Sequence, residues 1–310
     1  MSQSDTASFT DLIKEEVFEE PAALLAAFGA ERFRHSRWVF RGQPNAAWAL
    51  EPTLERLARS LGMVDIQYMI EKPTIREFRR RAHHYVRDLP DEGNLPEWLA
   101  LMRHYGAPTR LLDFTKSPYI AAFFATAEAQ RGEASAIWAV DSSALTNYSA
   151  LILSKEMSLQ YRQLGEAFIK TPSTSFATPE NFDVLTSNMG PFPQVVVPIE
   201  PFRINERMLV QRGLFLAQAA VIGPFETSLR NVLQFAHDDP ARREPMMSKI
   251  VIQPKVHRYV LRELHRMNLS YATLFPGLDG LARSLATVAR IRETGSPPGH
   301  PPMWDPEVTL

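Results

Sequence analysis

The sequence predicts an α+β fold in which a central mixed or antiparallel sheet is surrounded by helices. Short apolar runs such as 135-SAIWAVD-141 have the length and composition of buried strands, and amphipathic helical stretches lie between them. The two kinds of element follow one another without the steady alternation that is typical of a doubly wound parallel sheet. The sequence contains no glycine-rich dinucleotide turn and no phosphate loop of the usual type.

The first half of the chain contains two strand candidates among several helices. Apolar residues have helical spacing over 6–32, so residues 1–36 are predicted to form an N-terminal helical segment. Residues 37–43 (RWVFRGQ) and 110–115 (RLLDFT) have the composition of strands. Further helices are expected at about 52–62, 70–88, 94–105 and 117–130.

The second half alternates more evenly between strands and helices. Strands are expected at 135–141, 194–201, 213–218 and 249–254, and helices at 225–237, 256–267 and about 277–292. We therefore expect the main domain to cover 37–292. Residues 142–193 combine two amphipathic helices with a Pro/Ser/Thr-rich middle and form a candidate insertion. The Pro-rich tail, 293–310, is expected to lie on the surface or to be mobile.

Composition narrows the classes of function. The chain has 310 residues and a formal net charge of −1, which argues against a polyanion binder driven by bulk charge. It contains no cysteine, which excludes disulfides, thiolate catalysis and Cys-ligated metal sites. The sequence has neither a signal peptide nor an apolar run long enough to span a membrane, so we expect a soluble, cytoplasmic protein.

The first motif that indicates chemistry is 40-FRGQ-43, at the end of the first strand of the main domain. Arg41 offers a planar fork for a phosphate or carboxylate, and Gly42 allows a tight backbone turn beside Gln43. The alternative is structural: Arg41 would bond to sheet carbonyls or pair with Asp113. On these four residues alone the structural alternative is favoured.

The second motif is 104-HYGAPTRLLDFTKSPYIAAFFATA-127, which places polar groups on a segment that must be buried. Asp113 and Thr115 share one face of the predicted strand. The following helix begins near Ser117, so its amide groups would point toward the same place and could bind an anion. The structural alternative has Thr115 or Ser117 capping this helix and Arg110 paired with Asp113.

Two further motifs are less specific. The stretch 205-NERMLVQRGLFLAQ-218 presents Glu206, Arg207 and Gln211 before a strand, although a simple turn is the more common explanation. The stretch 76-REFRRRAHHYVR-87 places several arginines on one helical face, where they could contact nucleic-acid phosphates. A solvated charged face is the more common explanation there. No His/Asp/Glu set has the spacing of a metal-binding helix, so no metal is expected.

Taken together, these blocks resemble the FRG domain family. The resemblance comprises FRGQ with the downstream AWALEPTLER, then HYGAPTRLLDFTKSPYIAAFFA, ERMLVQRGLFLAQ and LHRMNLSYATLFPGLDGLARSL. The blocks cover about residues 37–285 and implicate the fold more strongly than any activity. More weakly, their order is similar to the plan of ADP-ribosyltransferases, which implies an ADP-ribosyltransferase-like core. The associations of the FRG domain family imply that the protein is a bacterial defence or toxin effector.

The weaker resemblance implies roles for particular residues. Arg41, with Gly42 and Gln43, would hold NAD, helped by Arg110 and the helix start at Ser117. Tyr105 or Phe114 would stack on a ring. Asp113 and Thr115 would stand at the second motif, and Glu206 or Gln211 at the third. The third position departs from the pattern, because an amide at Gln211 cannot supply the negative charge that stabilises an oxocarbenium-like transition state.

Three hypotheses about function follow from these observations. The first is a domain that binds NAD or a related nucleotide, with ADP-ribosyltransferase or NAD-cleaving activity toward a protein or nucleic-acid acceptor. The second is a nucleic-acid-binding module or nuclease that uses the arginine-rich helix. The third is a non-catalytic ligand sensor or adaptor. All three hypotheses are compatible with an oligomer, and none of them involves a membrane.

Overall fold

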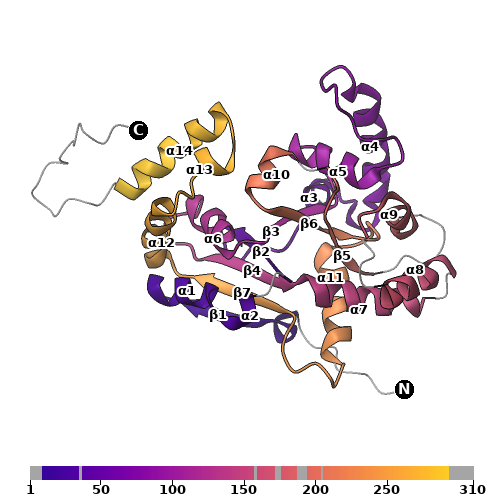
Figure 1. The fold of residues 1–310 in the computed structure, drawn as a ribbon, viewed down its shortest axis with the longest axis horizontal. Coiled ribbons are helices and arrows are strands. Elements are labelled where there is room, and N and C mark those ends of the chain that lie inside the picture. Colours follow the sequence, from indigo (N-terminus) through magenta and orange to yellow (C-terminus); the bar gives the residue numbers. More distant parts are fainter. Residues whose placement is uncertain are drawn as a thin grey trace, which may run out of the picture.

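The computed structural model describes residues 9–34, 37–156, 159–171, 176–186, 194–203 and 205–292. In these ranges seven strands form one sheet in the order β1-β7-β4-β2-β3-β6-β5, with helices on both faces (Figure 1). The strands are β1 (Lys14–Phe18), β2 (Trp38–Gln43), β3 (Leu111–Thr115), β4 (Ser135–Asp141), β5 (Val196–Ile199), β6 (Gly213–Gln218) and β7 (Met247–Ile252). β1 and β7 are parallel and the other neighbours are antiparallel, which confirms the predicted α+β class and mixed sheet.

The helices agree closely with the predicted pattern in the middle of the chain. They are η1 (Phe9–Leu12), α1 (Pro21–Phe28), α2 (Glu31–Arg34), α3 (Thr53–Ser60), η2 (Val64–Ile66), α4 (Tyr68–Ala82), α5 (Leu95–His104), α6 (Pro118–Ala127), α7 (Ser142–Ser154), α8 (Leu159–Lys170), α9 (Pro179–Thr186), α10 (Glu206–Val210), α11 (Phe225–His237), α12 (Pro254–Arg266), α13 (Tyr271–Leu274) and α14 (Leu278–Arg292). None of them is both long and apolar enough to cross a membrane, as far as the described residues extend.

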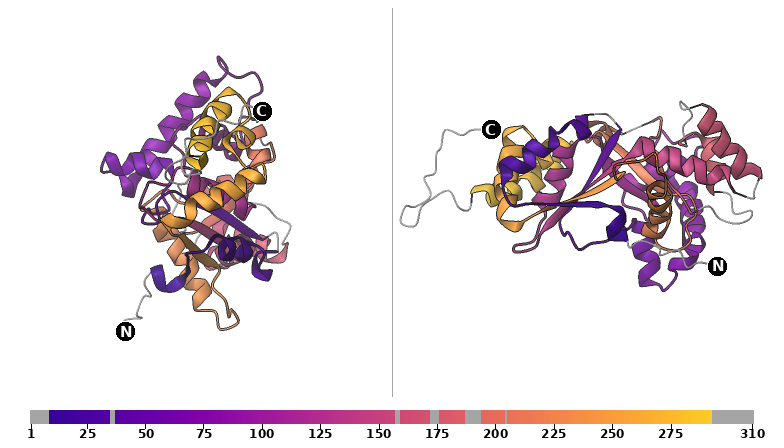
Figure 2. Two further views of the ribbon diagram at one scale, coloured as in Figure 1. Left: turned by 90° about the vertical axis from the view of Figure 1, so that its left-hand side faces the viewer. Right: turned by 90° about the horizontal axis from the view of Figure 1, so that it is seen from below.

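The sheet separates two hydrophobic cores. Successive residues of β2 alternate between them, because neighbouring side chains of a strand point to opposite faces: Trp38 and Phe40 join one core, and Val39 joins the other. The first core packs beneath α1, α6 and α12, and the second beneath α7 and α11. These two groups of helices lie at opposite ends of the molecule (Figures 1 and 2).

The weakest junction in the sheet is the one between β2 and β3. These strands share a single residue pair, Phe40 with Thr115, whereas β2 and β4 are paired along the whole of β2. Beyond that pair the backbones separate, and the next residue of β2, Arg41, sends its guanidinium across the gap to the carbonyl oxygen of Asp113 at 2.9 Å. The separation therefore leaves space between two strands in the middle of the sheet.

The prediction of a helical segment over 1–36 is wrong at Lys14–Phe18. These residues form the edge strand β1, which pairs with β7. Charged residues occupy three of the five positions, as edge strands often require to avoid aggregation, and this composition hid the strand from a hydrophobicity pattern. Lys249 of β7 lies 3.5 Å from Glu15, which helps to hold the edge in place.

The candidate insertion at 142–193 contributes to the core where it is described. Leu145 and Leu153 of α7 are fully buried in the core on that face of the sheet, and the Ser149 hydroxyl donates to the Val196 carbonyl oxygen of β5 at 2.8 Å. The helix is thus an integral layer of the domain. The Pro-rich tail at 293–310 lies outside the described residues.

We expect Gly42→Ala to destabilise the fold. A Cβ atom at residue 42 would stand 2.6 Å from the Ala125 amide nitrogen and overlap the Ala121 carbonyl oxygen, both of which are backbone atoms of α6 that cannot rotate away. Overpacking of this kind costs about 1–3 kcal/mol, or more where backbone must move. Urea unfolding should show the loss, whereas Gly93→Ala, at a site with open space around it, should change stability little. Equal stability of the two variants would contradict the close approach of β2 and α6.

Candidate functional site

A pocket of about 300 Å³ opens where β2 and β3 separate. Its lining combines four arginines and two carboxylates with several aromatic rings, and it comes from chain segments far apart in the sequence. The charged residues are Arg41, Arg103, Asp113, Glu128, Arg207 and Arg283. The excess of cations over carboxylates gives the pocket a positive potential, which favours an anionic ligand.

Arg41 is the most deeply placed cation of the pocket. Its side chain is 18% exposed, and one of its amino groups donates to the Asp113 carbonyl oxygen. The buried Nε has no hydrogen-bond partner among the described residues, so the bond of Nη1 to Asp113 leaves part of the guanidinium unsatisfied. Burial lowers the pKa of Arg41 to about 10; Asp113 opposes this, and Arg103 and Arg56 add to it. The group is therefore still a cation at neutral pH.

Asp113 lies between two arginines. Arg103, in the last turn of α5, binds its carboxylate with two donors, one of them Nε at 2.9 Å, and Arg41 Nη1 lies 4.0 Å from the same oxygen. Burial raises the pKa of Asp113, but the attraction of Arg103, Arg41 and Arg207 outweighs it and holds the pKa below the usual value. Asp113 is consequently an anion that orders the surrounding cations, and it is not a proton donor at neutral pH.

Arg207 and Arg283 come from the far side of the pocket. Their guanidinium groups lie over the Phe275 ring, 4.2 and 5.6 Å from its centre, in cation–π contact. Burial lowers the pKa of Arg207, Asp113 opposes this, and repulsion from Arg103 and Arg283 lowers the pKa further. A bound anion would relieve this repulsion between the arginines, and several arginines would stabilise it at once.

Gln211 and Thr115 close the floor between α10 and β3. The Gln211 side-chain amide donates to the Leu274 carbonyl oxygen at 2.8 Å, and the Thr115 hydroxyl donates to the Gln211 backbone oxygen at 2.6 Å. A second cavity of about 180 Å³ adjoins the first and shares Arg103, Asp113, Arg207 and Gln211 with it. Both predicted residues therefore line the pocket, held by bonds that order its wall.

Besides Asp113, two glutamates must be placed relative to the pocket: Glu206, which was predicted, and Glu128. Glu206 is exposed at the start of α10 and lines neither cavity. Glu128 follows the end of α6, lines the larger cavity, and accepts a hydrogen bond of 2.6 Å from the Tyr271 hydroxyl. The pocket carboxylate that no arginine binds among the described residues is thus Glu128, which the sequence did not single out.

Arg110 lies outside the site. It forms a buried ion pair with Glu71 of α4, with Nε 2.8 Å from the carboxylate, and Nη1 donates to the carbonyl oxygens of Gln218 and Ala219. The predicted structural pair between Arg110 and Asp113 is wrong, because Asp113 is taken by Arg103. Every contact of Arg110 is internal to the fold, so it lines neither cavity.

Four more residues predicted to bind a cofactor have structural contacts. Gln43 accepts from the Trp138 indole at 2.7 Å and donates to the Ala49 carbonyl oxygen at 3.0 Å. Ser117 caps α6 by accepting from the Ile120 amide, which confirms the capping alternative. Phe114 lines the pocket but is buried in the core, and Gly42 lines it where β2 meets α6.

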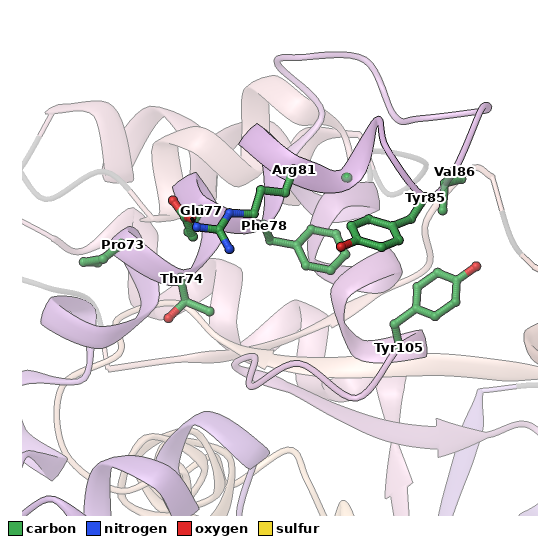
Figure 3. A pocket seen from close by; sticks show the side chains of 9 residues that line it. Pro73, Thr74, Glu77, Phe78, Arg81, Tyr85, Val86 and Tyr105 are labelled. Atoms are coloured by element: carbon green, nitrogen blue, oxygen red, sulfur yellow. Dashed lines mark ion pairs between the residues drawn. The ribbon is translucent and has the colours of Figure 1, made fainter.

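Tyr105 belongs to a different, apolar pocket of about 770 Å³ on the surface of α4. Figure 3 shows Tyr105 and Tyr85 at one end of it, and Glu77 and Arg81 toward the other, where they form an ion pair. Glu77 also pairs with Arg80, so the arginine-rich face of α4 is partly neutralised. Nothing in this pocket resembles the cluster of cations between β2 and β3.

Sequence patterns missed half of the charged residues of the site. Arg103 lies at the end of a predicted helix, and Arg283 lies in the stretch of about 277–292, for which only a helix was predicted. Their roles depend on contacts between distant segments, which no local motif encodes. Within the described part of the chain, no group of three or more His, Asp or Glu side chains could hold a metal ion.

Comparison with known protein families gives a match over one part of the chain. Residues 36–134 match the family model described as FRG domain, which confirms the resemblance to that family. The matched segment includes β2, β3 and α6, and with them Arg41, Arg103 and Asp113. Among curated proteins and solved structures, no match to the chain is found.

Proposed function

We propose that the pocket between β2 and β3 binds a nucleotide of the NAD class, within an ADP-ribosyltransferase-like core. The observation that carries the proposal is the group of four arginines around a cavity that is also lined by aromatic rings. Guanidinium groups bind phosphate oxygens with two parallel donors, and aromatic side chains stack on planar bases. A nucleotide diphosphate has both kinds of group within one small molecule.

The diphosphate is assigned to the arginines that still have free donors. Arg41 lines the cavity with a side chain that is still partly exposed, and Arg207 faces the same cavity from α10 with its pKa lowered by burial and by its cationic neighbours. Arg103 is held by Asp113, so it contributes mainly positive potential. In this proposal the arginines take the phosphate-binding role that was predicted for the amide groups at the start of α6, because the Ser117 side chain already caps that helix.

The reaction proposed for the bound nucleotide is cleavage of the bond between nicotinamide and ribose. That bond breaks with its electron pair leaving on nicotinamide, and the ribose carbon bonds to the oxygen of water or of an acceptor hydroxyl, which releases a proton. The ribose carries positive charge in the transition state. Glu128 is the pocket carboxylate without an arginine partner among the described residues, and it would stabilise this charge.

We expect the wild-type protein to bind NAD and to release nicotinamide, and Glu128→Gln to lower the rate of release by roughly 100-fold or more while NAD still binds. The measurements are calorimetric titration with NAD and chromatography of nicotinamide, with protein and nucleic-acid acceptors present. Glu206→Gln is the matched control, since Glu206 is exposed outside the pocket, and its rate should equal that of wild type.

The outcomes separate the three hypotheses about function. NAD binding without cleavage would leave a non-catalytic sensor. No binding of NAD or of other nucleotides would refute the proposal as a whole. Salt-sensitive binding of nucleic acid that is lost on charge reversal of Arg76 and Arg80 would instead favour the nucleic-acid module.

A further inference from the structure

We propose that the planar ring of the bound ligand stacks on the side chain of Trp48. The inference rests on the proposed function and narrows it: the pocket selects a phosphate compound that carries an aromatic base over a bare phosphate or diphosphate. Trp48 lines the same cavity as Arg41 and Arg207, so a ring on the indole and a phosphate on the arginines would belong to one molecule.

The other rings of the pocket are already in use. Phe40, Phe114 and Tyr271 are almost completely buried, and the Tyr271 hydroxyl is bonded to Glu128. A ligand could reach only their edges. Stacking needs an accessible ring face, because base and side chain gain most of their attraction from overlap of flat surfaces.

The two remaining phenylalanines are engaged by their neighbours. Phe275 lies under the guanidinium groups of Arg207 and Arg283, which take up its π surface. Phe124 is half-buried and packs edge-to-face against Phe275, with ring centres 6.0 Å apart. By elimination, the large accessible ring is that of Trp48, whose residue surface is 51% exposed.

The loop that carries Trp48 is held on both sides. Before it, the Ala46 amide donates to the Ala134 carbonyl oxygen at 2.7 Å. After it, the Ala49 carbonyl accepts from the Gln43 side chain, and the Leu50 amide donates to the Glu226 carboxylate at 2.8 Å. An exposed tryptophan on a pinned loop is a preorganised surface, so little ordering entropy opposes stacking. Gln43 thus acts on the site indirectly, by positioning the loop.

The exposure of Trp48 also distinguishes a binding role from a folding role. A half-exposed side chain contributes much less to stability than the fully buried rings around it. Tryptophan is usually found more deeply buried than this. The indole of Trp48 therefore keeps ring surface at a cationic pocket that a ligand can cover.

The test compares ADP, which has a base, with inorganic pyrophosphate, which has none. We expect Trp48→Ala to weaken ADP binding by roughly tenfold or more and to leave pyrophosphate binding unchanged, because stacking on an aromatic side chain contributes to the base alone. Trp48→Phe should recover a large part of the loss. Calorimetric titration gives both affinities without relying on tryptophan fluorescence. Tyr105→Ala removes an aromatic residue of similar exposure outside the pocket and should bind both compounds like wild type.

The experiment distinguishes failure of the stacking role of Trp48 from failure of the proposed nucleotide binding. Equal ADP affinity of Trp48→Ala and wild type would overturn the stacking role while nucleotide binding itself stands. Parallel loss of ADP and pyrophosphate binding would also overturn it, because the effect would then be on the pocket as a whole. If wild type binds neither compound, the proposed function fails and the stacking role fails with it.

Discussion

Arg41→Gln is expected to weaken ADP binding by a factor of roughly 10 to 100, the range for loss of a hydrogen bond to a charged group. Arg41 brings a buried cation and an unpartnered donor into the pocket, and glutamine keeps some length but no charge. Arg41→Lys should fall between wild type and Arg41→Gln, because lysine keeps the charge but lacks the planar fork.

The control for this prediction is Arg80→Gln, which removes an arginine from the exposed face of α4 and should leave ADP affinity unchanged. Thermal unfolding of each variant must accompany the titrations, because Arg41 also bonds to the Asp113 carbonyl oxygen across the gap in the sheet. A folded Arg41→Gln variant with wild-type affinity would show that the ligand does not use this arginine.

The largest effect on stability is expected from breaking the buried ion pair between Glu71 and Arg110. Their side chains are 2% and 6% exposed. Glu71→Ala should cost about 3–5 kcal/mol in the free energy of unfolding, because it leaves the Arg110 guanidinium buried without its counterion. Replacement of both residues by apolar side chains, Glu71→Leu with Arg110→Met, should recover part of the loss, because no charge then stays buried without its counterion, although the Gln218 and Ala219 carbonyl oxygens lose a donor. Urea unfolding measures both effects.

Glu77→Ala provides the matched control, since it breaks ion pairs with Arg80 and Arg81 on the same helix but in solvent. Exposed pairs contribute at most about 1 kcal/mol, so this variant should unfold close to wild type. If Glu71→Ala is no less stable than Glu77→Ala, the buried pair does not have the structural role assigned to it. The double variant should bind ADP like wild type, because Arg110 lies outside the pocket.

Local patterns were sufficient for most of the fold. The apolar composition of 37–43 and 135–141 predicted two central strands, and Ser117 with Pro118 marked the start of α6 correctly. They failed at Lys14–Phe18, whose charges suit the edge of a sheet, and they could not show that α7 is part of the core. In both places the partner strand or helix decides the structure, and that partner is distant in the sequence.

The residues of the site were likewise predictable where a local motif contains them, and not predictable where distant segments of the chain meet. Arg41, Asp113, Thr115 and Gln211 were predicted from their motifs and do come together. Arg110 was included because it stands beside Asp113 in the sequence, but its side chain extends to α4. The partner of Asp113 is Arg103, which the chain brings back from the preceding helix. Which charges pair is determined by packing, and the sequence alone leaves that choice open.

The single residue pair between β2 and β3 divides the sheet into two panels, β1-β7-β4-β2 and β3-β6-β5. Main-chain bonds join the strands within each panel, whereas across the seam one residue pair, the bond from Arg41 to Asp113 and the packing of α6 against β2 and β3 hold the panels together. A molecule bound by both Arg41 and Arg207 would add a cross-link between the panels. Occupancy of the pocket would then add to the contacts that hold the two panels together at this junction.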